Sequence, residues 1–185
     1  MAATDAQIIA AACDDAAAFA GLFDRHAEAV HRMVARRLGR QVADDIAGEV
    51  FRVAFEQRAR FDTTYTSALP WLYGIALNLI RRHQRDYTRR LRVLDRVAAS
   101  VPAAADPMST AADRLDATRD AVGLAAALAA LGPDDREVLL LVAWEQMTPT
   151  EAAAALGVPA GTARSRLHRA RQALLAAATK GDLDG

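Results

Sequence analysis

Apolar residues recur at three- and four-residue spacing through most of the first half of the chain, which is the spacing of one helical face. One or two helices are predicted over 5–38, ending at Gly39, and another over 42–59. The segment 61–67 is rich in Ser, Thr and Asp, which favours a loop. A third long helix is predicted to begin at 67–70, where a proline suits the first turn.

The same spacing returns near the C-terminus, after a segment without a wide apolar stripe. Residues 94–118 contain two prolines, small residues and scattered acids, which predicts a flexible linker. This divides the chain into a domain over 1–93, the linker, and a domain over 119–185. The helices expected in the second domain cover 118–131, 134–146, 149–156 and 160–178.

The last two of these helices follow a helix–turn–helix pattern. Thr148, Pro149 and Glu151 form the sequence of a capped helix start, and Gly157 suits a left-handed turn at the end of the same short helix. A short helix, a three-residue turn and a longer helix is the arrangement that places a recognition helix in the major groove of DNA.

Composition supports an all-α fold made of two small helical domains joined by a flexible linker. The chain holds 45 alanines and 22 arginines, both strong helix formers, and only 5% aromatic residues. No apolar run reaches the length of a membrane span, and no basic region precedes an apolar stretch at the N-terminus. With a single cysteine, Cys13, these features predict a cytoplasmic protein without a membrane segment.

Net charge is zero, so only local charge can indicate a nucleic-acid partner. In the last helix, Ala163, Leu167, Ala170 and Leu174 fall within about 60° on a helical wheel and predict the buried stripe. The opposite face is polar with arginines along its edges, and no acid occurs over 160–180. Four arginines without acidic neighbours in the helix would repel one another unless a polyanion neutralises them, although an ordinary solvated helix face is the alternative interpretation.

A second basic helix lies in the N-terminal half. Seven arginines stand against two aspartates over 75–96. Asn78, Arg81, Arg82 and Arg85 project within about 100° of one another, beside the apolar stripe. Such a helix can follow a phosphate backbone while Asn and Arg side chains contact base edges.

Three segments resemble bacterial sigma factors of the extracytoplasmic-function group. Residues 128–174 resemble sigma region 4, and the most specific part is the run from Gly161 to Arg171. The run from Asp44 to Phe51 resembles region 2.2, and the run from Leu69 to His83 resembles regions 2.3 and 2.4. The matches stand in the family's order, and sigma region 3 is absent, as in this group.

The resemblance implies a sigma factor that directs core RNA polymerase to promoters and helps to open the −10 element. It implies docking on the polymerase clamp and flap, and an anti-sigma factor that occludes those docking faces. The implied polymerase contacts are Asp44, Asp45, Glu49 and Phe51.

Two sets of promoter contacts follow. For the −10 element they are Tyr65, Trp71, Asn78, Arg81, Arg82 and Arg85. For the −35 element they are Thr162, Arg164, Ser165, His168, Arg169 and Arg171. Tyr65 offers a stacking face for a flipped base, and packing of the same ring on its own domain is an equal alternative.

Two other classes stay open on sequence: a stand-alone helix–turn–helix regulator that binds duplex DNA as a dimer, and a helical interaction protein. The acidic face and the Arg/Asn helix of the N-terminal half favour the sigma factor. Neither an enzyme nor a cofactor or metal site is predicted. The chain lacks the common zinc-protease, P-loop and serine-hydrolase motifs, and His26 and His31 do not share a helical face.

Overall fold

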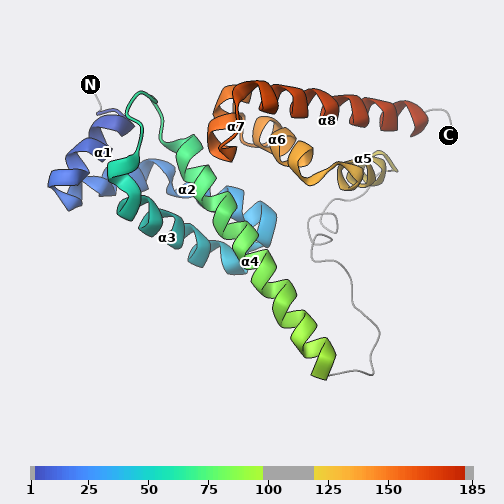
Figure 1. The fold of residues 1–185 in the computed structure, drawn as a ribbon, viewed down its shortest axis with the longest axis horizontal. Coiled ribbons are helices and arrows are strands. Elements are labelled where there is room, and N and C mark those ends of the chain that lie inside the picture. Colours follow the sequence, from blue (N-terminus) through green and yellow to red (C-terminus); the bar gives the residue numbers. More distant parts are fainter. Residues whose placement is uncertain (1–2, 98–118, 182–185) are drawn as a thin grey trace. The chain divides into compact units, whose positions relative to one another are not determined.

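The computed structural model describes the backbone of residues 3–97 and 119–181, with side chains for 3–92 and 123–177. All regular elements of this described part are helical, and they fall into two compact units (Figure 1). The prediction of an all-α fold is therefore confirmed. Most of the predicted linker lies outside the described residues.

The first unit is built around a long helix that packs across two others. Its α-helices are α1 (Asp5–Asp14), α2 (Ala20–Leu38), α3 (Arg40–Gln57) and α4 (Leu69–Val97). The N-terminal part of α4 packs against α2 and α3, and its Leu72, Ala76 and Leu77 are almost fully buried. Short 3-10 turns precede α2 and follow α3. Only the first half of α4 is packed in this way, and from Arg81 onward most of its described side chains are exposed.

A buried carboxylate joins three separate segments of this unit. Asp5, which is only 5% exposed, accepts hydrogen bonds from Arg25 Nη1 at 2.9 Å and from the Ala68 backbone N–H at 2.8 Å. His26 Nε2 lies 2.7 Å from its second oxygen. Burial by itself would raise the pKa of Asp5, but the hydrogen bonds from Ala68, His26 and Arg25 outweigh it and hold the pKa below its usual value. Asp5 thereby fixes α1 to α2 and to the residue that precedes α4.

The second unit is a four-helix cluster with an alanine-rich core. Its helices are α5 (Arg119–Ala130), α6 (Pro133–Ala143), α7 (Pro149–Leu156) and α8 (Ala160–Gly181). The predicted stripe of α8 is buried at Ala163, Leu167 and Ala170, and Leu174 packs at the edge of the same core. Val138 and Leu139 of α6 lie in this core, so α6 is held against α8.

The predicted helix–turn–helix is present as α7 and α8. Thr148 and Glu151 form the expected capping box, and Gly157 has a left-handed backbone with φ 65°. The Val158 N–H then bonds the Ala153 carbonyl at 3.0 Å and closes the end of α7. α6 ends at Ala143, three residues earlier than predicted.

The chain leaves α6 through a turn that the apolar pattern does not reveal. Gln146 has φ 56°, and its side-chain amide donates to the Ala143 carbonyl at 2.8 Å. Met147 is buried directly after it. The last apolar residue of the segment thus reaches the core from a turn and not from a continued helix.

Removing the Asp5 carboxylate should destabilise the first unit. In Asp5→Ala, His26 and the Ala68 N–H lose their buried acceptor, so we expect a loss of about 2–3 kcal/mol in the free energy of unfolding. Urea unfolding followed by circular dichroism measures the change, and Asp14→Ala, at an exposed position of α1, is the matched control. Unchanged stability in Asp5→Ala would contradict the role of this carboxylate.

The same group gives the unit a defined acid sensitivity. Because the folded pKa of Asp5 lies below its unfolded value of 3.8, its contribution is complete above that pH and is lost as the pH falls through the folded pKa. Asp5→Asn should lose this part of the pH dependence of stability.

Gly48 should be replaceable with a gain in stability. It is exposed inside α3, and a Cβ built there meets nothing within 4 Å. Gly48→Ala should therefore raise the free energy of unfolding by about 0.5–1 kcal/mol, because alanine loses less backbone entropy in a helix. Gly157→Ala is the contrasting control. Its φ of 65° strains any side chain, so the same chemical change should destabilise the second unit.

Candidate nucleic-acid interfaces

The outward face of α8 is the first candidate interface. Burial of Ala163, Leu167 and Ala170 turns the opposite side of the helix to solvent, where Ser165 and His168 are exposed. Arginines stand at both edges of this face, as the wheel predicts. The predicted contact residues that are exposed here are Arg164, Ser165, His168, Arg169 and Arg171, and Thr162 is half-buried.

Acids from α6 approach this arginine-rich face. Arg166 pairs with Asp134, and Arg169 binds Asp135 through two contacts, Nε to Oδ2 at 3.0 Å and Nη2 to Oδ1 at 2.6 Å. The hydrogen bond to Asp135 raises the pKa of Arg169 above its already high usual value. The expectation that these arginines lack acidic partners is thus wrong for two of the four. A helical wheel could not show this, because the acids lie more than thirty residues earlier in the chain.

The remaining two arginines differ from this pair. Arg164 and Arg171 are exposed, and no ion pair within the described residues includes either of them. Nearby, the Ser165 hydroxyl donates to the Thr162 carbonyl at 2.9 Å, which leaves its oxygen as an acceptor toward solvent. The face therefore combines open arginines, one arginine already held by an acid, and a small acceptor.

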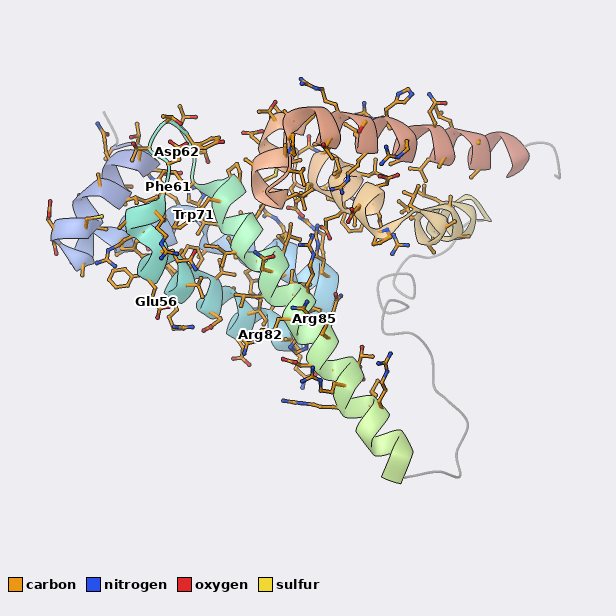
Figure 2. The ribbon with its side chains drawn as sticks, viewed as in Figure 1. Glu56, Phe61, Asp62, Trp71, Arg82 and Arg85 are labelled. Atoms are coloured by element: carbon orange, nitrogen blue, oxygen red, sulfur yellow. The ribbon has the colours of Figure 1, made fainter. Side chains whose placement is uncertain are left out.

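The exposed part of α4 is the second candidate interface. Asn78, Arg81, Arg82 and Arg85 are all exposed, beside the buried residues that hold the helix to its unit. Arg82 has a weak contact with Asp86, 3.9 Å within the same helix. Figure 2 shows Arg82 and Arg85 along α4, beyond the end that carries Trp71.

The loop ahead of α4 is built on an aromatic pair. Phe61 is buried and its ring centroid lies 5.2 Å from that of half-buried Trp71 (Figure 2). Asp62 accepts from the Thr64 N–H at 3.0 Å, and this hydrogen bond holds the pKa of Asp62 below its usual value. Tyr65 at the far side of this turn is 43% exposed. The turn thus presents the Tyr65 ring to solvent, while the Trp71 ring packs at a tilt against buried Phe61.

The acidic face of α3 is partly neutralised within its own unit. Asp44 lies 3.0 Å from His31 Nε2, and Asp45 is exposed. Glu49 accepts a hydrogen bond from Arg52 at 2.7 Å, which holds the pKa of the Glu49 carboxyl below its usual value.

Phe51 is a core residue and not part of this exposed face. It is 5% exposed, and its ring packs edge-on against Phe23 at 4.9 Å between centroids. The Phe51 side chain thus points into the unit, and its contact with polymerase stays a prediction. Phe23 of α2 is the exposed aromatic neighbour, at 48%. Both rings follow the apolar spacing of their helices, so the sequence does not distinguish the buried ring from the exposed one.

Two further properties of the described residues bear on function. They contain no group of three or more His, Cys, Asp or Glu side chains placed to hold a metal ion. None of their helices has the length and apolar character required to cross a lipid bilayer.

A helix–turn–helix unit and a separate unit with an exposed Arg/Asn helix define a class of two-part helical DNA-binding proteins. Family comparison identifies the group. Residues 22–90 match the model described as Sigma-70 region 2, and residues 122–174 match that of Sigma-70, region 4. The chain is 30% identical over 170 residues to the ECF RNA polymerase sigma factor SigL of Mycobacterium tuberculosis, covering 91% of this chain and 93% of SigL. It therefore belongs to the extracytoplasmic-function group of the sigma-70 family.

Other relatives agree with this assignment. RNA polymerase sigma factor CarQ of Myxococcus xanthus is 35% identical over 158 residues, which cover 85% of this chain and 87% of CarQ. The solved structure of CnrH in complex with the cytosolic domain of CnrY matches with a TM-score of 0.61 and 26% identity over 98% of this chain and 99% of that one. RpoE of Bartonella quintana, solved with the anti-sigma factor NepR, shares the fold with a TM-score of 0.59, covering 87% of this chain and 96% of RpoE at 23% identity.

Proposed function

We propose that this sigma factor binds core RNA polymerase, directs it to promoters and helps to open the −10 element. The observation that carries the proposal is that each unit holds one helix that is apolar where it packs and rich in arginine where it is exposed. The helix of the second unit, α8, suits the duplex −35 element, and the helix of the first unit, α4, suits the −10 element that opens.

Reading of the −35 element is assigned to α8. Its Ser165, His168 and Arg169 occupy the middle of the exposed face, where side chains reach base edges in a major groove. Arg164 and Arg171 at the edges suit phosphate contacts, which set the register of the helix on the duplex. Thr162 belongs to the first turn of α8, where its half-buried side chain lies close to the groove edge.

Opening of the −10 element is assigned to the loop before α4 and to the exposed start of its basic half. Exposed Tyr65 can stack on an unpaired base, and Trp71 stiffens the base of the loop through Phe61. Asn78, Arg81, Arg82 and Arg85 then follow one strand along the helix. Exposed arginines supply the phosphate contacts that single-stranded DNA requires.

Core polymerase is the proposed partner of the acidic face on α3, through Asp44, Asp45 and Glu49, with the second unit docking on the flap. An anti-sigma factor is proposed as a further partner, because RpoE was solved in complex with the anti-sigma factor NepR and CnrH in complex with the cytosolic domain of CnrY. The protein acts as a subunit in the cytoplasm and performs no catalysis of its own.

A stand-alone helix–turn–helix regulator is not favoured, because it would leave the region 2 unit without a role. Transcription in vitro with purified core polymerase on a promoter library separates the two classes. A sigma factor yields specific transcripts only when core is present. A regulator would footprint specific duplex sequences in the absence of polymerase and would give core no promoter specificity.

Charge reversal on α3 should weaken the complex with core polymerase. Asp45→Arg places a positive charge on the proposed docking face, so we expect the dissociation constant to rise by about tenfold at low salt, with a smaller effect at high salt. Fluorescence anisotropy with labelled protein measures it. Asp14→Arg has the same charge change on an exposed residue of α1 and should bind as the unmodified protein does. Equal binding by both variants would show that the interface lies elsewhere.

Substitutions on α4 and α8 should separate promoter opening from duplex recognition. Asn78→Ala and Arg85→Ala should lower permanganate reactivity of −10 thymines while the −35 footprint persists, because the proposed −35 contacts lie on α8 of the second unit. Arg171→Ala should weaken binding to all upstream sequences alike and lower the salt dependence of binding by about one phosphate contact. If Asn78→Ala instead removed the −35 footprint, the two units would be assigned to the wrong elements.

A further inference from the structure

We propose that Asp135 of α6 is a positioning residue for base recognition, and that it holds Arg169 in the orientation that reads a guanine in the upstream duplex. This inference rests on the proposed assignment of α8 to that element. It adds a residue from outside the recognition helix and names the base that Arg169 selects.

The geometry of the pair determines which guanidinium edge stays open. Asp135 takes the side edge of Arg169, with Nε to Oδ2 at 3.0 Å and Nη2 to Oδ1 at 2.6 Å. A guanidinium has five N–H donors in one plane, and this contact uses two of them. Both hydrogens of Nη1 and the second hydrogen of Nη2 stay available. One hydrogen of Nη1 and this hydrogen of Nη2 point the same way and form the adjacent, terminal edge of the group.

That terminal edge matches one base in the major groove. Guanine presents N7 and O6 as two adjacent acceptors, and a bidentate arginine is the commonest specific contact to it. The other bases offer at most one acceptor beside a donor or a methyl group at this edge. An arginine that is fixed in one plane therefore favours guanine more strongly than one that moves freely over the backbone phosphates.

Burial and charge support a fixed acid and an available arginine. The Asp135 side chain is 19% exposed, whereas that of Arg169 is 58% exposed, so the carboxylate is the anchored partner. Asp135 lies in the first turn of α6, where the helix dipole favours a negative charge. The next turn of α6 is locked in the core through Val138 and Leu139, against Leu167 of α8.

The neighbouring pair has the opposite distribution and provides a control. Arg166 is only 20% exposed, while its partner Asp134 is 63% exposed. Here the arginine is the covered partner, so less of its guanidinium is available to DNA than in Arg169. Asp134 and Asp135 nevertheless carry the same charge in the same turn of α6. Neutralising either one changes the field at α8 by the same unit of charge.

The expected phenotype is a loss of selectivity without a loss of affinity. An acid near the phosphates opposes DNA binding, so its removal should tighten binding to unrelated sequences. In Asp135→Asn, Arg169 is released from the bidentate pair and becomes free to contact a phosphate. Damage to the fold would have the opposite effect and weaken binding to every sequence.

The experiment uses holoenzyme reconstituted from core polymerase and the full chain. Duplexes with a randomised upstream element are selected with the unmodified protein, with Arg169→Ala, with Asp135→Asn, with the double variant and with Asp134→Asn. The position that loses its guanine preference in Arg169→Ala identifies the contacted base. Binding to matched guanine and adenine duplexes is then titrated against salt, and thermal unfolding of each variant is recorded.

Asp135→Asn should lower the preference for guanine at that position by about five- to tenfold, which is the lower end of the discrimination expected from a bidentate contact, because Arg169 itself is still present. It should bind duplexes with a scrambled upstream element at least as tightly as the unmodified protein, with a salt slope steeper by about one. In the Arg169→Ala background it should produce no further loss of selectivity. Asp134→Asn should tighten scrambled duplexes to a similar extent and keep the guanine preference.

Several outcomes would overturn the proposal. They are a guanine preference retained within twofold in Asp135→Asn, an equal loss in Asp134→Asn, or a base other than guanine at the Arg169 position. If Asp135→Asn lowers the unfolding temperature, Asp135→Glu decides instead. The proposal requires that Asp135→Glu bind the scrambled duplex as the unmodified protein does and keep part of the guanine preference. Complete loss of the guanine preference in Asp135→Glu would reject the proposal. Absence of any upstream preference in the unmodified holoenzyme would reject the proposed function itself.

Discussion

An arginine cannot leave water without a partner, and this constraint governs how both units of the protein are built. α4 and α8 each have an apolar stripe for packing and a basic remainder that must stay solvated or paired. Small residues such as Ala76, Ala163 and Ala170 let the packed side approach its neighbours closely. The thin core that results buries the apolar stripe of each helix. It leaves each arginine-rich side at the surface, where a nucleic acid can reach it.

Asp5 connects this construction to the surface of the first unit that is proposed to open the promoter. Its carboxylate binds the Ala68 N–H, one residue before α4 begins, and so fixes the end of the loop that carries Tyr65. The same carboxylate is bound from α2 by Arg25 and His26. The loop is therefore closed at its start by the buried ring of Phe61 and at its end by α1, while its middle projects into solvent. Such a loop can present an aromatic ring without reordering the helices on either side.

Periodicity and capping signals predicted the helices well, because both arise from residues close in sequence. The capping box at Thr148, the glycine turn and the buried stripe of α8 are all local features of this kind. The early end of α6 was missed, since its turn depends on the backbone of Gln146 and not on its hydrophobicity. The pairs that Arg166 and Arg169 form with the acids of α6 were missed too. These contacts form between elements, and the individual wheels hold no information about them.

The division of the recognition surface between two helices affects how specificity could be transferred from one sigma factor to another. Arg169 belongs to α8, but the acid that orients it belongs to α6, before the helix–turn–helix begins. A chimera that receives α8 alone would combine a foreign arginine with whatever residue its host has at the α6 position. Exchange of the whole segment from 119 to 181 would keep the pair together. Transfer of promoter preference would then require the entire second unit. A chimera that receives only the recognition helix would bind DNA with little sequence selectivity.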